Sequence, residues 1–573
     1  MARTKSLSLL DLGFFLMETA ERAANIGPLA VVKIPERFQT GAEFADWLMS
    51  KMKAQPVGEP FDYMYSPPGL RRMPKLEAVA VDLDDHCFRM TLPAPGNNHQ
   101  LFDLICDIHV QRLDRSRPPW EFYIIDGLEN RRIAIYAKVH HGLIDGRGFV
   151  EICTRWFSSD PKSHEVRAFW QGLRPRARGD SGQQASTLGA LSLIRKMLGT
   201  SLTVAALSRF LFRQALKTVG MAKGTPLPFI GTPEVFVPSP AIKRSFAYCT
   251  LPFHEMKDFG KRHHATVNDI LLTVLDMAMT RYVKEHGVKR HKPLVVDMPV
   301  ALGATGSGGN KIAVVQFPLG TQKSPPAERL REICEHTSEV KDQIRSESAA
   351  AMAIYAAAIH GVPLVTETLG LKHPPTLANA MISNPFGFPE RIYIGGGEVE
   401  LALPISILVQ GHTLNITAIS HDADFQIAYL GIAKHLPDIQ KLADYTADAF
   451  KDLHAAFDEV APDTAVVAAA TVADKRKPVS KATPKVAKPT VEAKTRKVAA
   501  KADVPPLPKP AKAATRVKAA AGAPATKRKA ATKPIDKATT KEEDPIADAD
   551  ADADVARSDI VVIQAPESTR LPA

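Results

Sequence analysis

Aromatic residues are absent from the last part of this 573-residue chain, where none follows Phe457. Ala, Lys, Pro, Thr and Val fill that stretch without a repeating period. A segment of this composition buries too little apolar surface to offset the entropy lost on folding. We therefore predict a disordered tail over residues 461–573, outside any packed domain.

Acidic residues are absent from a second stretch, between Ser181 and Pro233. Cations share this stretch with leucines and other apolar residues at helical spacing. One interpretation is a basic amphipathic helix that lies in a membrane interface. The other is a helix packed between two domains with its cations merely solvated, and helical periodicity does not separate the two. In either case residues 181–240 are expected to connect two domains. The cations are Arg195, Lys196, Arg209, Arg213, Lys217 and Lys223.

Cysteine is scarce, with five scattered residues and no CxxC pair. An odd number without metal-ligand spacing indicates free thiols in a reducing compartment. The N-terminus carries no secretory signal, because the apolar run from Leu7 to Met17 is interrupted by Asp11 and soon followed by Glu18. The expected location is cytoplasmic, and neither a metal nor a redox cofactor is implied.

Long uncharged runs are limited to two that are long enough to span a membrane, Ser348–Thr366 and Leu401–Ser420. The first is mostly alanine and contains Pro363. The second contains Pro404 and several polar residues. We therefore expect both runs to be buried core elements and no segment to be transmembrane.

Charge is unevenly distributed along the chain, whose formal net charge is +11. Residues 475–541 contain 20 Lys and Arg against 3 Asp and Glu, a net charge of +17. Residues 542–573 contain 2 against 9, a net charge of −7, which leaves +1 for residues 1–474. The body is therefore nearly neutral, and the basic character belongs to the tail. A body of this length predicts two or three domains.

The most informative stretch is His140-His141-Gly142-Leu143-Ile144-Asp145-Gly146, which follows the β-forming run from Arg132 to Val139. Successive side chains of an extended strand point to opposite faces, so only one of the two histidines can face a given cavity. A neutral imidazole is a natural general base near neutral pH. Glycines beside it would let a substrate carbonyl approach closely. The alternative for a bare His-His pair is a buried structural pair with one ring satisfied by an Asp.

Four blocks in order resemble the bacterial wax ester synthase/acyl-CoA:diacylglycerol acyltransferase family. The central block is HHxxxDG, the signature of the CoA-dependent acyltransferase superfamily. Before it, Leu113–Glu121 (LDRSRPPWE) is similar to the family's PLDRSRPLWE block, and Asp84–His86 with Leu92–Gly96 is similar to its single DYH…LPAPG block. After it, Ala265–Asp269 (ATVND) repeats a further family motif. The resemblance extends from about Leu7 to about Leu453.

This resemblance implies a fold of the α/β class, with two chloramphenicol-acetyltransferase-like halves around a central channel. The HHxxxDG turn would lie at the middle of that channel. We assign residues 1–180 to the N-terminal half and residues 241–460 to the C-terminal half, with the tail outside both. Alternating strand and helix patterns over the first 160 residues agree with an α/β layer.

The implied reaction is transfer of a fatty acyl group from acyl-CoA, as substrate, to a diacylglycerol or a long-chain alcohol. By the resemblance His141 is the general base, His140 supports the loop, and Asp145 pairs with a cation and fixes the loop beside Gly146. Asn268 and Asp269 are interpreted first as helix-capping residues. The candidate substrate-binding residues in the family motifs are Gly142, Pro119, Trp120, Asn268 and Asp269.

The second half departs from the family pattern. Ala301-Leu302-Gly303 stands where an Arg usually follows the strand Pro293–Val300, and Ser383–Pro389 disturbs the order of the NVPGP motif. Because of these departures, the resemblance identifies the acceptor of the acyl group less closely than it identifies the type of reaction.

Two other classes of protein stay open. A condensation-type acyltransferase would use another acceptor and take acyl groups from carrier proteins, although no carrier domain is recognised in this chain. A lipid-inclusion or nucleic-acid-binding protein would act through its basic tail, by counterion release at phosphates. We expect a peripheral attachment to a membrane or lipid inclusion, with nucleic acid as a further possible partner of the tail.

Overall fold

The computed structural model describes residues 3–458 and 562–563, with gaps at residues 8, 69–73, 145, 174–207, 210–211, 213, 215–228, 230–233, 238–240, 289–291, 302–311, 347–348, 370, 372–374 and 386. Most of the stretch without acidic residues and nearly all of the tail therefore lie outside the described residues. The helix expected near Leu191–Lys223 stays a prediction. The disorder expected for residues 461–573 also stays a prediction, except at Val562–Ile563, which form strand β17.

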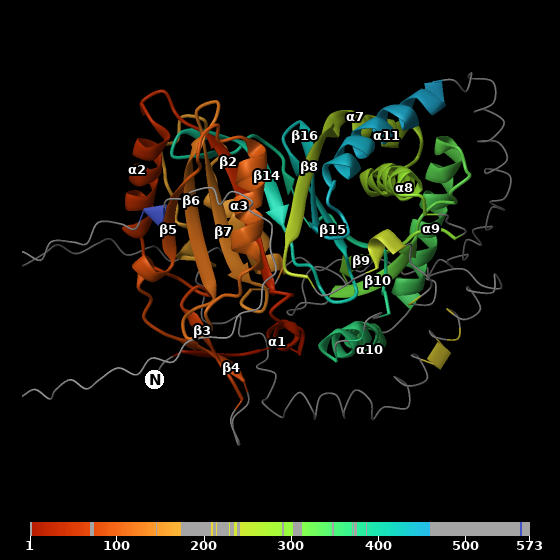
Figure 1. Ribbon diagram of the computed structural model, residues 1–573, viewed down its shortest axis with the longest axis horizontal. Coiled ribbons are helices and arrows are strands. Elements are labelled where there is room, and N and C mark those ends of the chain that lie inside the picture. Colours follow the sequence, from red (N-terminus) through yellow and green to blue (C-terminus); the bar gives the residue numbers. More distant parts are fainter. Residues whose placement is uncertain are drawn as a thin grey trace, which may run out of the picture. The chain divides into compact units, whose positions relative to one another are not determined.

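The first half is built on a mixed sheet in the order β13-β14-β2-β7-β6-β5-β17 (Figure 1). Its central strand β7 pairs antiparallel with β2 on one side and β6 on the other. A small sheet, β1-β4-β3, completes this half. The bounds are β1 (Thr4–Ser6), β2 (Asn25–Lys33), β3 (Tyr63–Ser66), β4 (Lys75–Ala78), β5 (Cys87–Thr91), β6 (Trp120–Leu128), β7 (Arg132–His140), β13 (Tyr393–Ile394), β14 (Gly397–Ile405) and β17 (Val562–Ile563).

Helices cover both faces of the first sheet. Helix α2 (Gly41–Lys53) begins at the N-cap Thr40, whose side chain accepts the Glu43 N–H, and its apolar side packs on one face. Helix α3 (Asn98–Val110) begins with a capping box made by Asn97 and Gln100 and packs on the other face. Helices α1 (Leu9–Met17) and α4 (Gly146–Trp156) belong to the same half.

The second half is a seven-stranded sheet in the order β10-β9-β11-β15-β16-β8, with β12 pairing onto β15. The helices of this half pack on the sheet and form one apolar core with it (Figure 1). The strands are β8 (Arg244–Pro252), β9 (Val295–Ala301), β10 (Ile312–Pro318), β11 (Ala380–Ser383), β12 (Gly387–Phe388), β15 (Leu414–His421) and β16 (Asp424–Ile432). The helices are α7 (Phe253–Arg262), α8 (Val267–Glu285), α9 (Pro326–Ser346), α10 (Ala349–Thr368) and α11 (Gln440–Asp458).

The two halves share a core and exchange a strand. Strand β14 comes from the C-terminal part of the chain, yet it pairs with β2 in the first sheet. Helix α3 of the first half packs against β8 of the second, where Phe102 contacts Phe246 edge to face. Leu101, Leu403 and Leu430 meet in the same apolar cluster. The predicted α/β fold of two halves is confirmed, and a sequence boundary at residue 240 does not separate them in space.

The expectation of burial is met by one of the two long uncharged runs and not by the other. Leu401–Ser420 forms β14, a loop and β15 and is almost wholly buried, as expected. The described residues of the run Ser348–Thr366 lie in α10, and the expectation that this run is a buried core element is wrong toward its C-terminal end. Val362 and Val365 are 40% and 55% exposed, because only one side of this helix packs on the second half. Among the described residues, no helix is long and apolar enough to cross a membrane.

Candidate active site

Strand β7 delivers the His-His pair, and every residue of this strand is buried. This confirms the strand predicted for residues 132–139. The His140 imidazole is 1% exposed, and its Nδ1 accepts the Gly142 N–H at 3.0 Å. Because Nδ1 is an acceptor, the neutral ring carries its proton on Nε2. That proton faces the Glu18 carboxylate, with 3.9 Å between His140 Nε2 and Glu18 Oε1.

His141 as a whole residue is only partly buried, unlike His140, although its ring Nδ1 is buried and has no hydrogen-bond partner among the described residues. Its ring stacks on Phe14, with ring centroids 3.9 Å apart, and its backbone N–H donates to the Ala24 carbonyl at 2.7 Å. Ring and backbone are therefore held from two directions, while part of the residue remains accessible. Of the two histidines, His141 is the better placed to meet a substrate.

Burial determines the protonation of both rings. It lowers the pKa of His140 to about 3, with smaller contributions from Arg115 and His141. Burial also lowers the pKa of His141, and the nearby Asp11 offsets part of that shift. Both imidazoles are therefore neutral near pH 7, which is the form in which a histidine accepts a proton.

Helix α1 lies directly against the pair. Phe15 stacks on His140 with centroids 4.1 Å apart, beside the stacking of Phe14 on His141. A Cβ atom at Gly142 would lie 2.6 Å from Phe15 Cε2 and 2.8 Å from the Asp11 carbonyl oxygen. In the structure it is α1 that approaches Gly142 closely. Substrate binding by Gly142 stays a prediction.

Glu18 is a site residue that sequence reasoning did not identify. Its side chain is 1% exposed; it accepts from Arg115 Nη2 at 2.7 Å and from the Ala24 N–H at 3.2 Å. Arg115 also donates to the Phe15 carbonyl at 2.8 Å. The LDRSRPPWE block thus supplies a cation that holds the end of α1. A carboxylate directly after an apolar helix was the only signal in the sequence, and many surface residues share it.

Pro119 and Trp120 lie behind the histidine pair. The His140 N–H donates to the Pro119 carbonyl at 3.0 Å. Trp120 is 1% exposed, donates from Nε1 to the Phe61 carbonyl at 2.7 Å and stacks on His86. His86 Nδ1 in turn bonds the Trp120 carbonyl at 2.7 Å. The motifs around His86 and Trp120 therefore meet in one buried stack, and these contacts support the strand that carries the pair.

The ATVND motif begins helix α8, with Thr266 rather than Asn268 as the N-cap. The Asp269 carboxylate accepts the Thr266 N–H at 2.8 Å, and the Thr266 hydroxyl accepts the Asp269 N–H at 3.2 Å. The capping expected of Asp269 is confirmed. Asn268 does not cap the helix; it is exposed, and its Oδ1 accepts from Asn384 Nδ2 at 2.9 Å. The structure thus brings together two motifs that are 116 residues apart.

The remaining predicted residues are Asp145 and Gly146. Asp145 lies outside the described residues, so its pairing with a cation stays a prediction. Gly146 is the first residue of α4. Among the described residues no cluster of three or more His, Cys, Asp or Glu side chains could hold a metal ion. All five cysteines are free thiols, as expected.

An apolar recess lies between the two halves, with an open volume of about 350 Å³. It receives side chains from β2 and α4 of the first half and from β12, β14 and β15. Helix α4 starts at the end of the HHxxxDG motif, so two of the residues that line the recess follow the histidine pair closely in the sequence. Its lining residues are Pro28, Leu29, Ala30, Phe149, Cys153, Phe157, Phe388, Ala402, Leu403, Pro404 and Ile419.

Two joined α/β halves with a neutral histidine at the end of a buried strand define a CoA-dependent acyltransferase of the HHxxxDG type. Two family models match this chain: the wax ester synthase/diacylglycerol acyltransferase catalytic domain over residues 7–271, and the C-terminal domain of the same proteins over residues 308–454. The chain belongs to the wax ester synthase/diacylglycerol acyltransferase family and is an acyltransferase.

Similar proteins agree with this assignment. The "Probable diacyglycerol O-acyltransferase Tgs4" of Mycobacterium tuberculosis H37Rv is 29% identical over 467 residues, covering 79% of this chain and 98% of that protein. The "Probable diacyglycerol O-acyltransferase tgs2" of the same strain is 28% identical and covers 78% and 98%. A solved wax ester synthase/diacylglycerol acyltransferase from Marinobacter aquaeolei VT8 is 25% identical, with a TM-score of 0.59 and coverage of 78% and 98%.

Proposed function

We propose that this enzyme transfers a fatty acyl group from acyl-CoA to the hydroxyl of a diacylglycerol or a long-chain alcohol, with His141 as the general base. The observation that carries this assignment is the partly accessible, neutral His141 beside a fully buried His140. The names of the similar proteins support these two acceptors.

In the proposed reaction the His141 imidazole removes the proton from the acceptor hydroxyl. The oxygen attacks the thioester carbonyl carbon, and the tetrahedral intermediate collapses with cleavage of the C–S bond. The CoA thiolate leaves and takes up the proton from the imidazolium. A thiol with a reference pKa near ~8.5 is a good leaving group, so little acid assistance is required. His140 and Glu18 orient the loop without contacting the reacting atoms.

Replacing His141 by Ala tests the assignment. General-base catalysis contributes about 10²- to 10⁴-fold, so His141→Ala should lose at least about 100-fold in kcat. His140→Ala should retain more activity, and His454→Ala, which removes a histidine from the distant helix α11, should retain nearly all. Turnover is measured with labelled palmitoyl-CoA and a panel of alcohols that includes a diacylglycerol. Near-normal turnover by folded His141→Ala protein would exclude His141 as the base.

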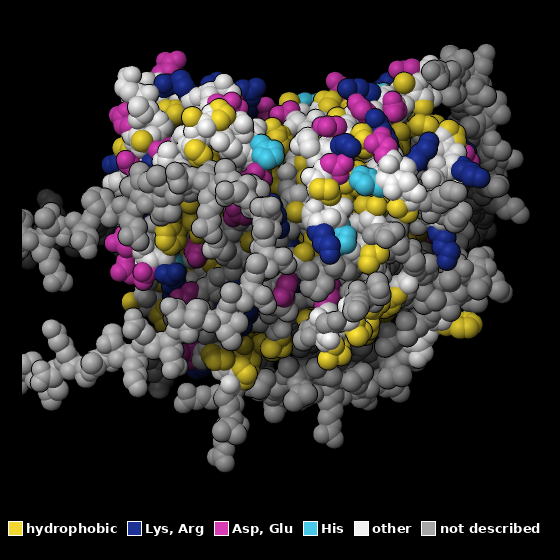
Figure 2. All heavy atoms as spheres, in the orientation of Figure 1, with side chains coloured by type: hydrophobic (Ala, Val, Ile, Leu, Met, Phe, Trp, Pro, Cys, Tyr) yellow, Lys and Arg dark blue, Asp and Glu magenta, His cyan; other side chains and the backbone are white. Residues whose placement is uncertain are grey.

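We further propose that the face formed by α1 and the end of α10 docks on a lipid surface. Val365, Leu369 and Leu371 are 55%, 72% and 47% exposed, and Leu16 on α1 is 64% exposed. Hydrophobic side chains gather along the edge where these two helices lie (Figure 2). The only acidic or basic residue in α10 is Glu367, which is buried. An exposed apolar face without charge fits an acyl-chain boundary, which is where diacylglycerol resides.

Aspartate substitutions test this face. Val365→Asp and Leu369→Asp should weaken binding to phosphatidylcholine vesicles that contain diacylglycerol, while turnover of a dispersed short-chain alcohol stays unchanged. Ile242→Asp, at an apolar residue that is 53% exposed outside this face, is the matched control. Vesicle binding by the Val365 and Leu369 variants that equals that of the control would rule this face out.

A further inference from the structure

The chain between α1 and β2 touches both histidines of the site. We call this segment, Met17–Ala24, the clasp loop. At one end the Glu18 carboxylate faces His140 Nε2 at 3.9 Å. At the other end the Ala24 carbonyl accepts the His141 N–H at 2.7 Å. The clasp loop therefore holds the backbone of His141 through Ala24 and places a carboxylate beside the His140 ring through Glu18.

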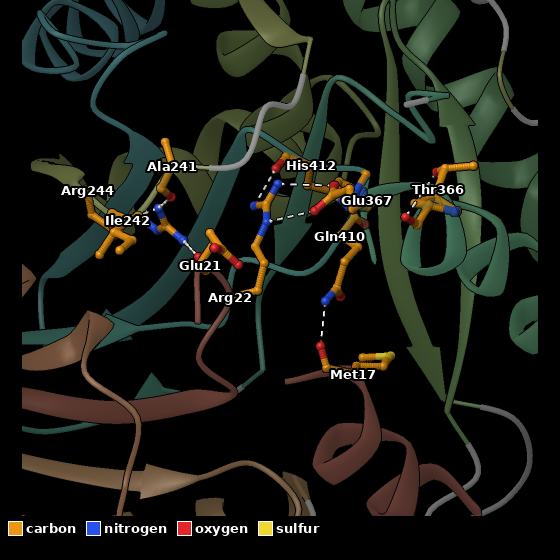
Figure 3. A network of polar contacts seen from close by, with 12 residues as sticks. Met17, Glu21, Arg22, Ala241, Ile242, Arg244, Thr366, Glu367, Gln410 and His412 are labelled. Atoms are coloured by element: carbon orange, nitrogen blue, oxygen red, sulfur yellow. Dashed lines mark hydrogen bonds and ion pairs between the residues drawn. The ribbon is translucent and has the colours of Figure 1, made fainter. Parts of the chain in front are cut away.

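The second half of the molecule holds this loop through Arg22 (Figure 3). Arg22 Nε and Nη2 donate to the two carboxylate oxygens of Glu367 on α10, each at 3.2 Å. Arg22 Nη1 donates to the His412 carbonyl at 3.0 Å, and Glu367 Oε1 also accepts the Gly411 N–H at 2.8 Å. One side chain of the first half thus joins α10 and the loop before β15.

Two more contacts hold the clasp loop from the same side (Figure 3). Gln410 Nε2 donates to the Met17 carbonyl at 2.5 Å, and Arg244 Nη2 donates to the Glu21 carbonyl at 2.6 Å. Both donors belong to the second half, so the loop is held at its start, its middle and its end.

The anchoring groups are themselves rigidly held. The Arg22 and Glu367 side chains are 2% and 6% exposed. His412 is fully buried, and its Nε2 bonds Asp297 on β9 at 2.8 Å. The other Asp297 oxygen accepts from Gln316 on β10 at 2.6 Å. A bidentate pair with this little solvent permits one geometry and is costly to break.

From this arrangement we infer that Arg22 is a positioning residue for the acyl transfer. Through Glu367 and the 410–412 loop, the second half fixes the clasp loop and so orients His141, and the catalytic geometry is complete only when the two halves are joined. Arg22 contacts neither substrate nor the reacting atoms. This inference rests on the proposed role of His141.

Arg22→Lys and Glu367→Gln test the inference in the full-length enzyme. Lysine keeps the charge, but its single ammonium cannot contact both carboxylate oxygens of Glu367 and also donate to the His412 carbonyl in the way that a guanidinium does. Because small displacements of a catalytic group are costly, kcat should fall by about 10- to 100-fold. The KM for acyl-CoA should change by less than about twofold, since the substrate contacts remain. Gln410→Ala removes one contact of the clasp loop and should have a milder effect in the same direction.

The pH profile separates positioning from mere loss of stability. A loosened clasp loop lets water reach His141, which raises its pKa toward the ordinary value and moves the acid limb of the kcat profile to higher pH. These substitutions alter none of the described titratable or charged groups around His141, which are Asp11, Glu18, His140 and Arg115.

Asp276→Asn is the matched control, because it breaks the buried pair with Arg329 inside the second half, with 2.9 Å between Arg329 Nη1 and Asp276 Oδ2. It should lower the urea midpoint without moving the acid limb or the kcat of the folded enzyme. The inference is overturned if Arg22→Lys and Glu367→Gln keep kcat within about twofold of the unsubstituted enzyme. It is also overturned if they lose no more kcat than Asp276→Asn does and the acid limb of their kcat profile stays at the same pH. An active His141→Ala enzyme would instead overturn the base assignment, so the two failures are distinguishable.

Discussion

Two neighbouring histidines of identical chemistry take different positions because α1 packs over them. His140 points into the protein, where the Gly142 N–H donates to its Nδ1 and so sets its tautomer, with the Glu18 carboxylate 3.9 Å from its Nε2. His141 stacks on Phe14 and is only partly buried as a residue. The alternation of a strand predicts that the two rings diverge. It does not predict which of them meets the substrate, because that depends on a helix more than 120 residues earlier in the chain.

Gly142 provides a prediction at the same scale. A Cβ there would overlap Phe15 and the Asp11 carbonyl, so Gly142→Ala should push α1 away from the histidines. We expect a loss of stability of about 1–3 kcal/mol, as for other overpacked sites, together with a fall in kcat. Gly361→Ala is the control, because no atom lies within 4 Å of the added Cβ. Urea unfolding and turnover are measured, and a fully active Gly142→Ala enzyme would contradict this account of the glycine.

Buried histidines also predict how stability depends on pH. Burial lowers the pKa of His109 and His140 to about 3 and that of His360 to about 4. An unfolded histidine titrates near ~6.5, so between about pH 6.5 and pH 3–4 the unfolded chain binds more protons. The free energy of unfolding should therefore fall as the pH is lowered through this window.

His109→Gln tests that dependence. The glutamine keeps a donor and an acceptor for Tyr136 and Ser406 but does not titrate. Urea unfolding at several pH values should show a slope smaller by up to about 1.4 kcal/mol per pH unit, which corresponds to one proton. His99→Gln, at an exposed histidine, is the control and should leave the slope unchanged. An unchanged slope in His109→Gln would show that this histidine is not buried in its neutral form.

Secondary structure was the part of the fold that sequence patterns predicted well. The apolar run before His140 and the capping signal at Asp269 are both local, and both are confirmed. The elements and residues that pack against one another, by contrast, are far apart in the sequence. The apolar alternation of residues 397–405 indicates a strand, but the same pattern fits either sheet. Arg22 and Glu367 are 345 residues apart, so no spacing in the sequence connects them.

The exchanged strand β14 gives a prediction at the scale of elements. Its register shifts between Val399 and Leu401, and Gln426 on β16 satisfies the irregular backbone. Gln426 Oε1 accepts the Ala402 N–H at 2.7 Å, and its Nε2 donates to the Glu400 carbonyl at 3.2 Å. Gln426→Leu would leave both backbone groups unpaired in a buried place, which costs about 1–3 kcal/mol for each group.

The measurement is urea unfolding of Gln426→Leu against Gln440→Leu. Gln440 makes one exposed side-chain contact, with Asp444, at the start of α11. Loss of stability by the Gln426 variant alone is expected, with both halves unfolding together because they share this strand. Equal stability of the two variants would contradict the role given to Gln426.

At the scale of the whole molecule, both halves contribute to holding one site. The first half supplies the histidines, and the second half supplies α10 and the 410–412 loop, which hold the segment before β2. Family motifs identified the site because they concentrate around it in the chain. The residues that hold the halves together lie mostly outside those motifs, and only the folded structure shows them.

The last prediction concerns the tail and rests on charge. Residues 1–474 carry a net charge of +1, whereas residues 475–541 carry +17, so attraction to anionic surfaces should come from the tail. Each cation near an anionic lipid surface contributes on the order of 1 kcal/mol, within a Debye length of about 10 Å at 0.1 M salt. Several such contacts give reversible binding that high salt abolishes. The acidic residues 548–554 would compete and weaken it in the intact chain.

A chain truncated after Val460 should therefore keep full activity on dispersed substrate and lose salt-sensitive binding to anionic vesicles and to DNA. The two polyanions, compared at the same salt concentration, report which one the tail prefers. Removing only residues 542–573 is the control, and it should strengthen binding because the acidic segment is lost. If the truncated body still binds both polyanions as tightly, the attraction resides in the basic segment from Leu191 to Lys223, because that stretch is the other concentration of uncompensated cations.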